Sequence, residues 1–175
     1  MKSFTLLAGL LFSSTASSAV QGIKSPKPPS LNHLCSVNFT LGDAIPIGSG
    51  PRGIRLVIPI LNGTFWGPRL KGTILPIGAD WALLDPKYGL DPDKSFTADV
   101  RTTFKTHDGE FIQVTLSGER QSDDARKRTL VRIGMEAGSE RYYWVNSLVG
   151  LGVVMRPAEE GREFELGMEF WQAQL

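Results

Sequence analysis

The stretch FTADVRTTFKTHDGEFIQVTL, residues 96–116, carries the clearest fold signal in this chain. Residues 96–105 place an apolar or threonine side chain at alternate positions and a more polar one between them, as in a β-strand with one buried face. The pair Asp108-Gly109 follows, and this dipeptide between alternating segments is a strong signal for a tight hairpin turn. Residues 111–116 then alternate again. The stretch therefore predicts two neighbouring antiparallel strands.

The same alternation recurs along most of the remaining sequence. Gly, Pro, Asn and Asp interrupt it at short intervals, as turns do. The further candidate strands are residues 35–41, 54–61, 70–75, 80–84, 129–135, 141–145, 148–156 and 164–171. Only residues 123–127 are compatible with a short helix. About nine or ten short strands predict an all-β domain, a single closed or nearly closed antiparallel β-barrel, because closure removes exposed strand edges.

The N-terminal residues have the pattern of a secretory leader. Lys2 precedes a short apolar run at residues 4–12, and small residues lead to a cleavage position after Ala19. We therefore expect a secreted protein, or one resident in the secretory lumen. Its expected segments are a signal peptide at residues 1–19, a Pro-rich linker arm at residues 20–33 and the barrel domain at residues 34–175.

Two Asn-X-Thr sequons fit this secretory route. Asn62 lies in an expected turn, whereas Asn38 lies in an expected strand with its side chain on the face opposite Val37 and Phe39. Both Asn38 and Asn62 are candidate glycosylation sites.

Charge balance and rare residues limit the possible functions. The 175 residues include 19 basic and 18 acidic ones, and the basic block at residues 126–128 follows two aspartates, so we expect no nucleic-acid partner. Cys35 is the only cysteine, which excludes a disulfide within the chain. One cysteine and two histidines at unrelated spacings supply no metal-ligand set, and we expect no cofactor. No segment has the roughly 18 apolar residues of a membrane span. Monomer and homodimer both remain open.

Residues 62–85, NGTFWGPRLKGTILPIGADWALLD, combine charged and aromatic side chains around Gly-rich turns. Arg69 and Asp80 stand close in sequence to Trp66 and Trp81, so these four could line a pocket for a flat, polar ligand. The alternative is structural. Tryptophans of turn-rich strands often fill a core, and an Asp after Gly often caps a turn.

A second charged pair has two interpretations as well. Asp99 and Arg101 lie on the polar face of the strand at residues 96–105. They either point to solvent or contribute to the same pocket.

Several short motifs, taken in order, resemble a known family. These are GPRLKG at residues 67–72, GADW at 78–81, ADVR at 98–101, HDG at 107–109 and YYWVN at 142–146. Their order and spacing are similar to those of a small β-barrel family catalogued as a domain of unknown function. The similarity covers nearly the whole expected domain. Secreted fungal members of that family include hetero-Diels–Alderases of tropolonic sesquiterpenoid pathways.

The resemblance implies a reaction between hydrophobic small-molecule substrates, a tropolone-derived o-quinone methide and a humulene-type sesquiterpene. Such an addition needs an apolar cavity that orients both partners, and donors aimed at the oxygen where charge develops. The candidate catalytic residues are Arg69, Asp80, Asp99 and Arg101. The candidate walls of the cavity are Trp66, Trp81, Tyr142, Trp144, Met155 and Phe170.

Other functions suit the same features. A lipocalin-like carrier would use the same barrel and aromatic lining without changing its ligand. A non-pericyclic isomerase or cyclase would use the barrel as a template, and a purely structural or effector protein would need no site. His107 stands beside Asp108-Gly109, where a turn residue is expected more often than a catalytic base.

Overall fold

The computed structural model describes residues 25–120, 128–155 and 165–175. Eleven strands form one sheet, joined by two short 3₁₀ helices, and all strand pairings are antiparallel. The strands are β1 (Ser30–Leu41), β2 (Ile45–Gly50), β3 (Gly53–Trp66), β4 (Lys71–Ile74), β5 (Gly78–Asp80), β6 (Leu83–Leu84), β7 (Thr97–Thr106), β8 (Phe111–Glu119), β9 (Thr129–Glu136), β10 (Gly150–Met155) and β11 (Glu165–Gln174). The 3₁₀ helices are η1 (Pro86–Tyr88) and η2 (Glu140–Ser147).

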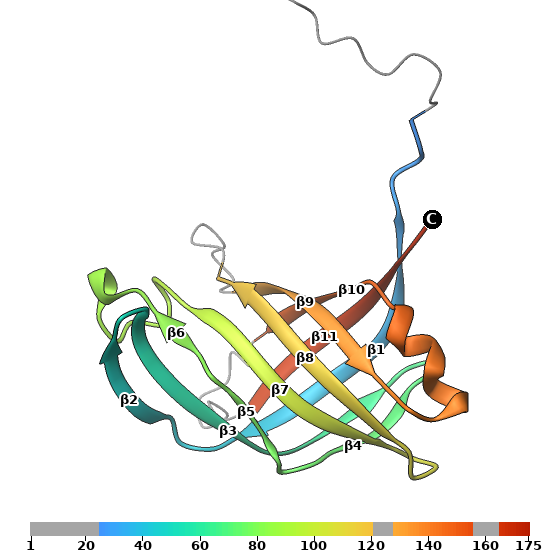
Figure 1. Ribbon diagram of the computed structural model, residues 1–175, viewed down its shortest axis with the longest axis horizontal. Helices are drawn as coiled ribbons and strands as arrows, with labels where there is room; N and C mark the ends of the chain where they lie inside the picture. Colours follow the sequence, from blue (N-terminus) through green and yellow to red (C-terminus); the bar gives the residue numbers. More distant parts are fainter. Residues whose placement is uncertain (1–24, 121–127, 156–164) are drawn as a thin grey trace, which may run out of the picture.

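The sheet closes on itself into a barrel (Figure 1). The order around the barrel is β1-β11-β10-β9-β8-β7-β4-β3, and β1 then pairs with β3 to complete the ring. The expected closed antiparallel all-β barrel is thereby confirmed. Closure leaves β2 outside the ring as an edge strand on β3.

Three short strands share one position in the wall between β3 and β7. β4, β5 and β6 each pair with both of these long strands, at successive points along them. A continuous strand was expected at residues 80–84. The chain instead leaves the sheet after Asp80 and rejoins it at Leu83.

The barrel interior is filled by the side chains at alternate strand positions. On β7 and β8 these are Val100, Phe104, Ile112, Val114 and Leu116, as the opening hairpin pattern predicts. Phe104 lies at the centre, since its ring stacks on Phe65 at 4.4 Å between centroids and on Phe170 at 6.5 Å. Aromatic pairs at these separations add to the free energy of burial.

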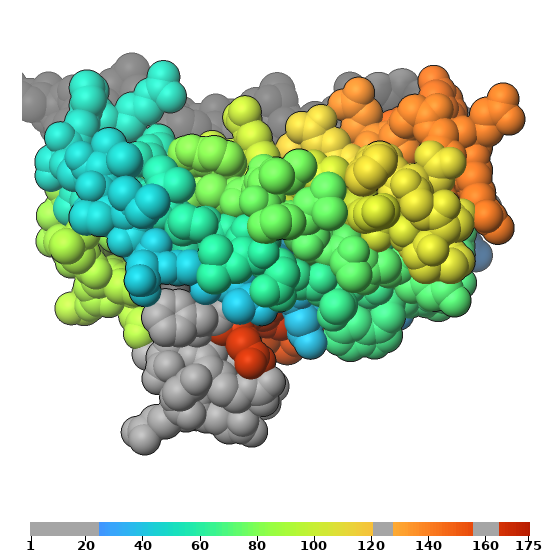
Figure 2. Space-filling model, turned by 90° about the horizontal axis from the view of Figure 1, so that it is seen from below, coloured from blue at the N-terminus to red at the C-terminus, as the bar shows by residue number. Residues whose placement is uncertain are grey.

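Helix η2 packs against one end of the barrel. Figure 2 shows the turn between β7 and β8, in yellow, beside η2, in orange. The strand expected at residues 141–145 is wrong, because this segment belongs to η2. Its buried residues, Tyr142 and Val145, are three positions apart, which is the repeat of a 3₁₀ helix and not of a strand.

Other boundaries also differ from expectation. β1 begins at Ser30, where it pairs with Gln174, so the last residues of the expected linker arm belong to the sheet. β2 was not expected at all. The expected helix at residues 123–127 and the leader lie outside the described residues. Among the residues that the structure does describe, no helix is both long enough and apolar enough to cross a bilayer.

Candidate functional site

A cavity of about 230 Å³ lies in the half of the barrel where β7 begins and β8 ends. Its wall is mainly apolar and comes from strands all around the ring. It includes Phe39, Ile58, Phe96, Val100, Val131 and Met168. Phe39 also contacts Phe104, at 6.4 Å between ring centroids, so the cavity borders the central phenylalanines through Phe39. A concave, mostly apolar site with a few polar groups is typical of small-molecule binding.

Asp80 is one of these polar groups, and the pairing of β5 directs it inward. It pairs with Ile58 on β3 and with Val100 on β7, and both partners line the cavity. Residues directly opposite each other in antiparallel strands share a face of the sheet. Gly78 permits this pairing, since a Cβ there would come within 2.5 Å of the Arg101 carbonyl oxygen. The GADW motif thus places a carboxyl group in the barrel.

Burial governs the protonation of Asp80. Loss of solvation raises the pKa of its carboxyl group from 3.8 to about 6, and the neighbouring Asp99 carboxylate adds to the rise. Two groups oppose the rise, the Asp99 backbone amide, which donates to Asp80 Oδ1 at 2.9 Å, and the Arg55 guanidinium. Because Oδ1 accepts that amide proton, the neutral acid carries its own proton on Oδ2. A pKa of about 6 suits a group that exchanges protons near neutral pH.

Arg120 is the second ionisable group in the cavity wall. Its side chain is only 4% exposed, and Nη1 lies 2.6 Å from Asp93 Oδ1. The Arg120 backbone amide donates to the Phe96 carbonyl at 2.8 Å, which ties the end of β8 to the start of β7. A buried guanidinium held in this way supplies fixed N–H donors beside the cavity, with its charge shared with Asp93.

Arg120 is not among the residues that the sequence patterns singled out, yet a signal for it exists. Ile112, Val114 and Leu116 are buried on β8, and continuing this alternation two residues at a time reaches position 120. An arginine in phase with a buried face is expensive to bury without a partner, so it marks a site.

Two of the four expected catalytic residues lie on the outside of the barrel. Asp99 and Arg101 are next to Val100 on β7, which faces inward, so they project from the opposite face. Their side chains are 50% and 65% exposed and face each other with Arg101 Nε 3.9 Å from Asp99 Oδ1. The expectation that they line the cavity is wrong. Asp99 acts on the site through its backbone amide and, from the outer face, through the charge of its carboxylate.

Arg69 lies outside the cavity as well. Its guanidinium carbon is 3.5 Å from the ring centroid of Trp144 in η2, a close cation–π contact. Arg69 and Trp144, both expected in the cavity, therefore contact each other at η2. Of the four expected catalytic residues, Asp80 alone lines the cavity.

The expected aromatic walls are also elsewhere. Trp66, Trp81 and Met155 are exposed side chains outside the cavity lining, and Phe170 is part of the central core. Tyr142 is buried in η2. The apolar part of the cavity wall instead consists of aliphatic residues and two phenylalanines, Phe39 and Phe96.

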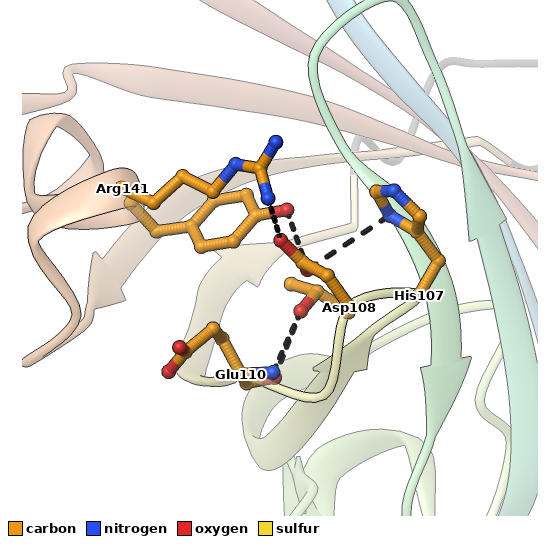
Figure 3. Close-up of polar contacts among 6 residues, drawn as sticks. His107, Asp108, Glu110 and Arg141 are labelled. Carbon is orange, nitrogen blue, oxygen red and sulfur yellow. Dashed lines mark hydrogen bonds and ion pairs between the residues drawn. The ribbon is translucent and has the colours of Figure 1, made fainter.

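Tyr142 belongs to a polar cluster at the other end of the β7–β8 hairpin (Figure 3). Its hydroxyl donates to Asp108 Oδ1 at 2.8 Å, and Arg141 Nη1 donates to Asp108 Oδ2 at 2.6 Å. A hydrogen bond from Thr106, then that from Tyr142 and the Arg141 charge, lower the pKa of Asp108 to about 2. His107 lies in the same turn, with Nδ1 3.9 Å from Asp108 Oδ1.

This cluster fastens the hairpin turn to η2. Gly109, at φ +94°, makes the turn possible, since a residue with a Cβ rarely adopts that conformation. The interpretation of His107 as a turn residue agrees with this arrangement. The HDG and YYWVN motifs of the sequence thus meet in a structural contact, far along the hairpin from Asp80.

Both sequon asparagines are exposed. Asn38 projects from β1 between buried Val37 and Phe39, and Asn62 lies on β3.

Comparison with known proteins gives a family and several relatives. The family described as "Protein of unknown function (DUF3237)" matches residues 29–172. A UPF0311 protein of Rhodopseudomonas palustris is 25% identical over 141 residues, which cover 73% of this chain and 88% of that protein. The hydroalkoxylation enzyme phnH of Penicillium herquei is 28% identical over 150 residues, covering 85% of this chain and 87% of that enzyme.

Solved structures show the same fold. A β-barrel-like protein of Acinetobacter baumannii superimposes with a TM-score of 0.72 at 27% identity, over 86% of this chain and 99% of that one. The crystal structure of an enzyme from Penicillium herquei superimposes with a TM-score of 0.64 at 26% identity, over 86% and 98% of the two chains.

Proposed function

The chain belongs to the DUF3237 family of small β-barrel proteins, and from this premise we propose that it is an enzyme of secondary metabolism that closes an oxygen-containing ring on a hydrophobic small molecule. The observation that carries the proposal is Asp80, a carboxyl group with a pKa of about 6 in the wall of an otherwise mostly apolar cavity. The Penicillium herquei relative, a hydroalkoxylation enzyme on a similar barrel, supports a reaction of this kind.

Hydroalkoxylation adds the O–H of an alcohol across a C=C bond. An O–C bond and a C–H bond form while the O–H bond and the alkene π bond break, so no atom is lost and no cofactor is consumed. Neutral Asp80 donates its Oδ2 proton to one alkene carbon, the substrate hydroxyl oxygen bonds to the other, and the hydroxyl proton returns to the carboxylate. The barrel contributes by holding oxygen and alkene in contact, which can supply several kcal/mol of the barrier.

A second candidate is the hetero-Diels–Alder addition of a tropolone-derived o-quinone methide to a humulene-type sesquiterpene. It also joins an oxygen to an alkene, and the buried Arg120 favours it, because fixed N–H donors stabilise negative charge growing on the oxygen of the heterodiene. The cavity volume of about 230 Å³ is below the roughly 300–1,000 Å³ of common ligand pockets. One small molecule fills such a space, so the intramolecular reaction is the first choice.

The test incubates purified protein with hydroxyalkenes that can cyclise and, separately, with the two hetero-Diels–Alder partners. An enzyme accelerates product formation and delivers one stereoisomer in excess. A carrier binds the same molecules and leaves the rate and the stereoisomer ratio at background, and that result would refute the proposal. The matched variants are Asp80→Asn and Asp99→Asn. Asp80→Asn should lose at least ten-fold in turnover, which corresponds to roughly 1.4 kcal/mol of activation free energy. Asp99→Asn should lose less than two-fold.

We propose further that the protein is made in the secretory pathway and carries glycans on Asn38 or Asn62. The leader pattern and the exposure of both asparagines support this. Intact-mass measurement of protein from its native host, before and after deglycosylation, tests it. A mass that includes Met1–Ala19 and does not change on deglycosylation would contradict both parts.

A further inference from the structure

A second pocket, of about 370 Å³, adjoins the barrel cavity. It lies between the segment that follows β6, the start of β7 and the end of β8. Phe96 and Arg120 belong to the walls of both spaces. A molecule bound in the barrel cavity therefore has this second pocket as its immediate neighbour.

The second pocket differs from the barrel cavity in its charges. Its lining includes three cations, Arg52, Lys94 and Arg120, and two acids, Asp85 and Glu119. We call it the basic pocket. Arg52 is exposed, and within residues 25–120, 128–155 and 165–175 no carboxylate pairs with it. An uncompensated arginine at the edge of a pocket is suited to an anionic oxygen group.

Each of the other charged groups in this lining already takes part in an interaction, among them Glu119, and Arg120 with Asp93. Lys94 Nζ lies 3.3 Å from Asp91, and its side chain is 64% exposed, so that contact is easily exchanged for a ligand. Asp85 Oδ1 accepts the Lys87 backbone amide at 2.9 Å and so caps η1.

We propose that the basic pocket binds an anionic oxygen group, such as a phenolate, enolate or carboxylate, of the molecule whose apolar part occupies the barrel cavity. Arg120, at the wall common to both spaces, contacts the ligand where its apolar and charged parts meet. Arg52 and Lys94 bind the charged end from the solvent side. An anionic group on the ligand would define the substrate class, and this role in catalysis rests on the proposed function. Binding to the basic pocket can be measured without turnover.

Two fluorescent probes that differ by one charged group provide the test. 8-Anilinonaphthalene-1-sulfonate carries a sulfonate, and N-phenyl-1-naphthylamine has the same ring system without it. Affinities of both are measured for the wild type, for the double variant Arg52→Gln with Lys94→Gln, and for Arg101→Gln, which removes a cation from the outer wall of the barrel. All three replaced residues are exposed, so we expect these variants to fold. Arg120 is left unchanged because of its buried contact with Asp93.

The double variant should bind the sulfonate probe at least five-fold more weakly and the uncharged probe within two-fold of the wild type. Arg101→Gln should change neither affinity by more than two-fold. Raising the salt concentration from 0.05 to 0.5 M should reproduce the selective loss in the wild type, because it shortens the Debye length. Equal losses for both probes, an unchanged sulfonate affinity in the double variant, or the same loss in Arg101→Gln would each overturn the inference.

The outcome separates the two proposals. If the probe pattern holds and no substrate is cyclised, the basic pocket stands and the proposed function fails. If substrates are cyclised and the probe pattern is absent, the proposed function stands and the basic pocket does not bind anions.

Discussion

Replacing Asp80 by Asn should make the protein more stable at neutral and alkaline pH while removing activity. Asn has nearly the same shape, and its Oδ1 can still accept the Asp99 backbone amide. What the replacement removes is the cost of ionising a carboxyl group in the cavity wall. The prediction thus separates a residue kept for chemistry from one kept for stability.

The magnitude follows from the pKa of Asp80, which is raised from 3.8 to about 6 in the folded protein. The folded state holds the proton more tightly than the unfolded state. Asp80 is therefore least costly to the fold below pH 3.8, and stability is lost as the pH rises from there through about 6. Once both states are ionised, the loss is about 3 kcal/mol. At pH 8, Asp80→Asn should gain about that amount, or roughly 6–12 °C in Tm for a domain of this size.

The assay is chemical denaturation at several pH values from 3 to 8. The difference in the free energy of unfolding between Asp80→Asn and wild type should be near zero at pH 3 and should grow to its full value above pH 6. Asp99→Asn, which changes an exposed carboxylate one strand away, is the control and should show at most a small part of this growth, because its charge raises the pKa of Asp80 less than burial does. A variant no more stable than wild type at pH 8 would refute the claim that Asp80 is a desolvated acid.

Three further predictions concern other parts of the molecule. Arg101→Gln should leave turnover within two-fold of wild type, because its side chain is on the outer face; a ten-fold loss in a steady-state assay would show that the outer face takes part. Gly78→Ala should lower turnover and should lower the free energy of unfolding by roughly 1–3 kcal/mol, because the Cβ of the alanine would push β5 away from β7. Unchanged turnover and an unchanged free energy of unfolding would contradict the role given to this glycine. Asp108→Asn should lower Tm at pH 7, and its difference in Tm from wild type should shrink as the pH falls toward 2. The reason is that the depressed pKa of Asp108 stabilises the fold above pH 3.8, and this stabilisation is lost as the carboxylate takes up its proton. A Tm difference that stays constant with pH would argue against the contact with η2.

Much of the fold could be predicted from the sequence because the barrel is built from local alternation. Residues 96–116 show both strands and the turn between them, and the structure has the same hairpin. Closure was also predictable, since many short strands without disulfides need an arrangement without free edges. The segment 141–145 was misassigned because a short run with two tyrosines and a tryptophan suits a strand by composition, whereas its burial repeats every third residue.

The site was harder to predict because its residues are defined by pairing between distant strands. Asp80 ends a strand of three residues, too short for alternation to show its face, and only its partners Ile58 and Val100 place it inside. Asp99 and Arg101 show the opposite case. Their polar face was visible in the sequence, and the family motif suggested otherwise, yet strand alternation determined their position.

The central claim, that neutral Asp80 is the acid for ring closure, is tested most directly by the pH dependence of kcat/KM. Because the protonated form acts, kcat/KM for cyclisation should be constant below pH 6 and should fall about ten-fold for each unit of pH above it, with an inflection at the pKa of about 6. The Asp80→Asn variant should lack both the inflection and most of the activity. A profile that stays flat from pH 5 to 8, or an Asp80→Asn variant that cyclises substrate at the wild-type rate, would contradict the claim.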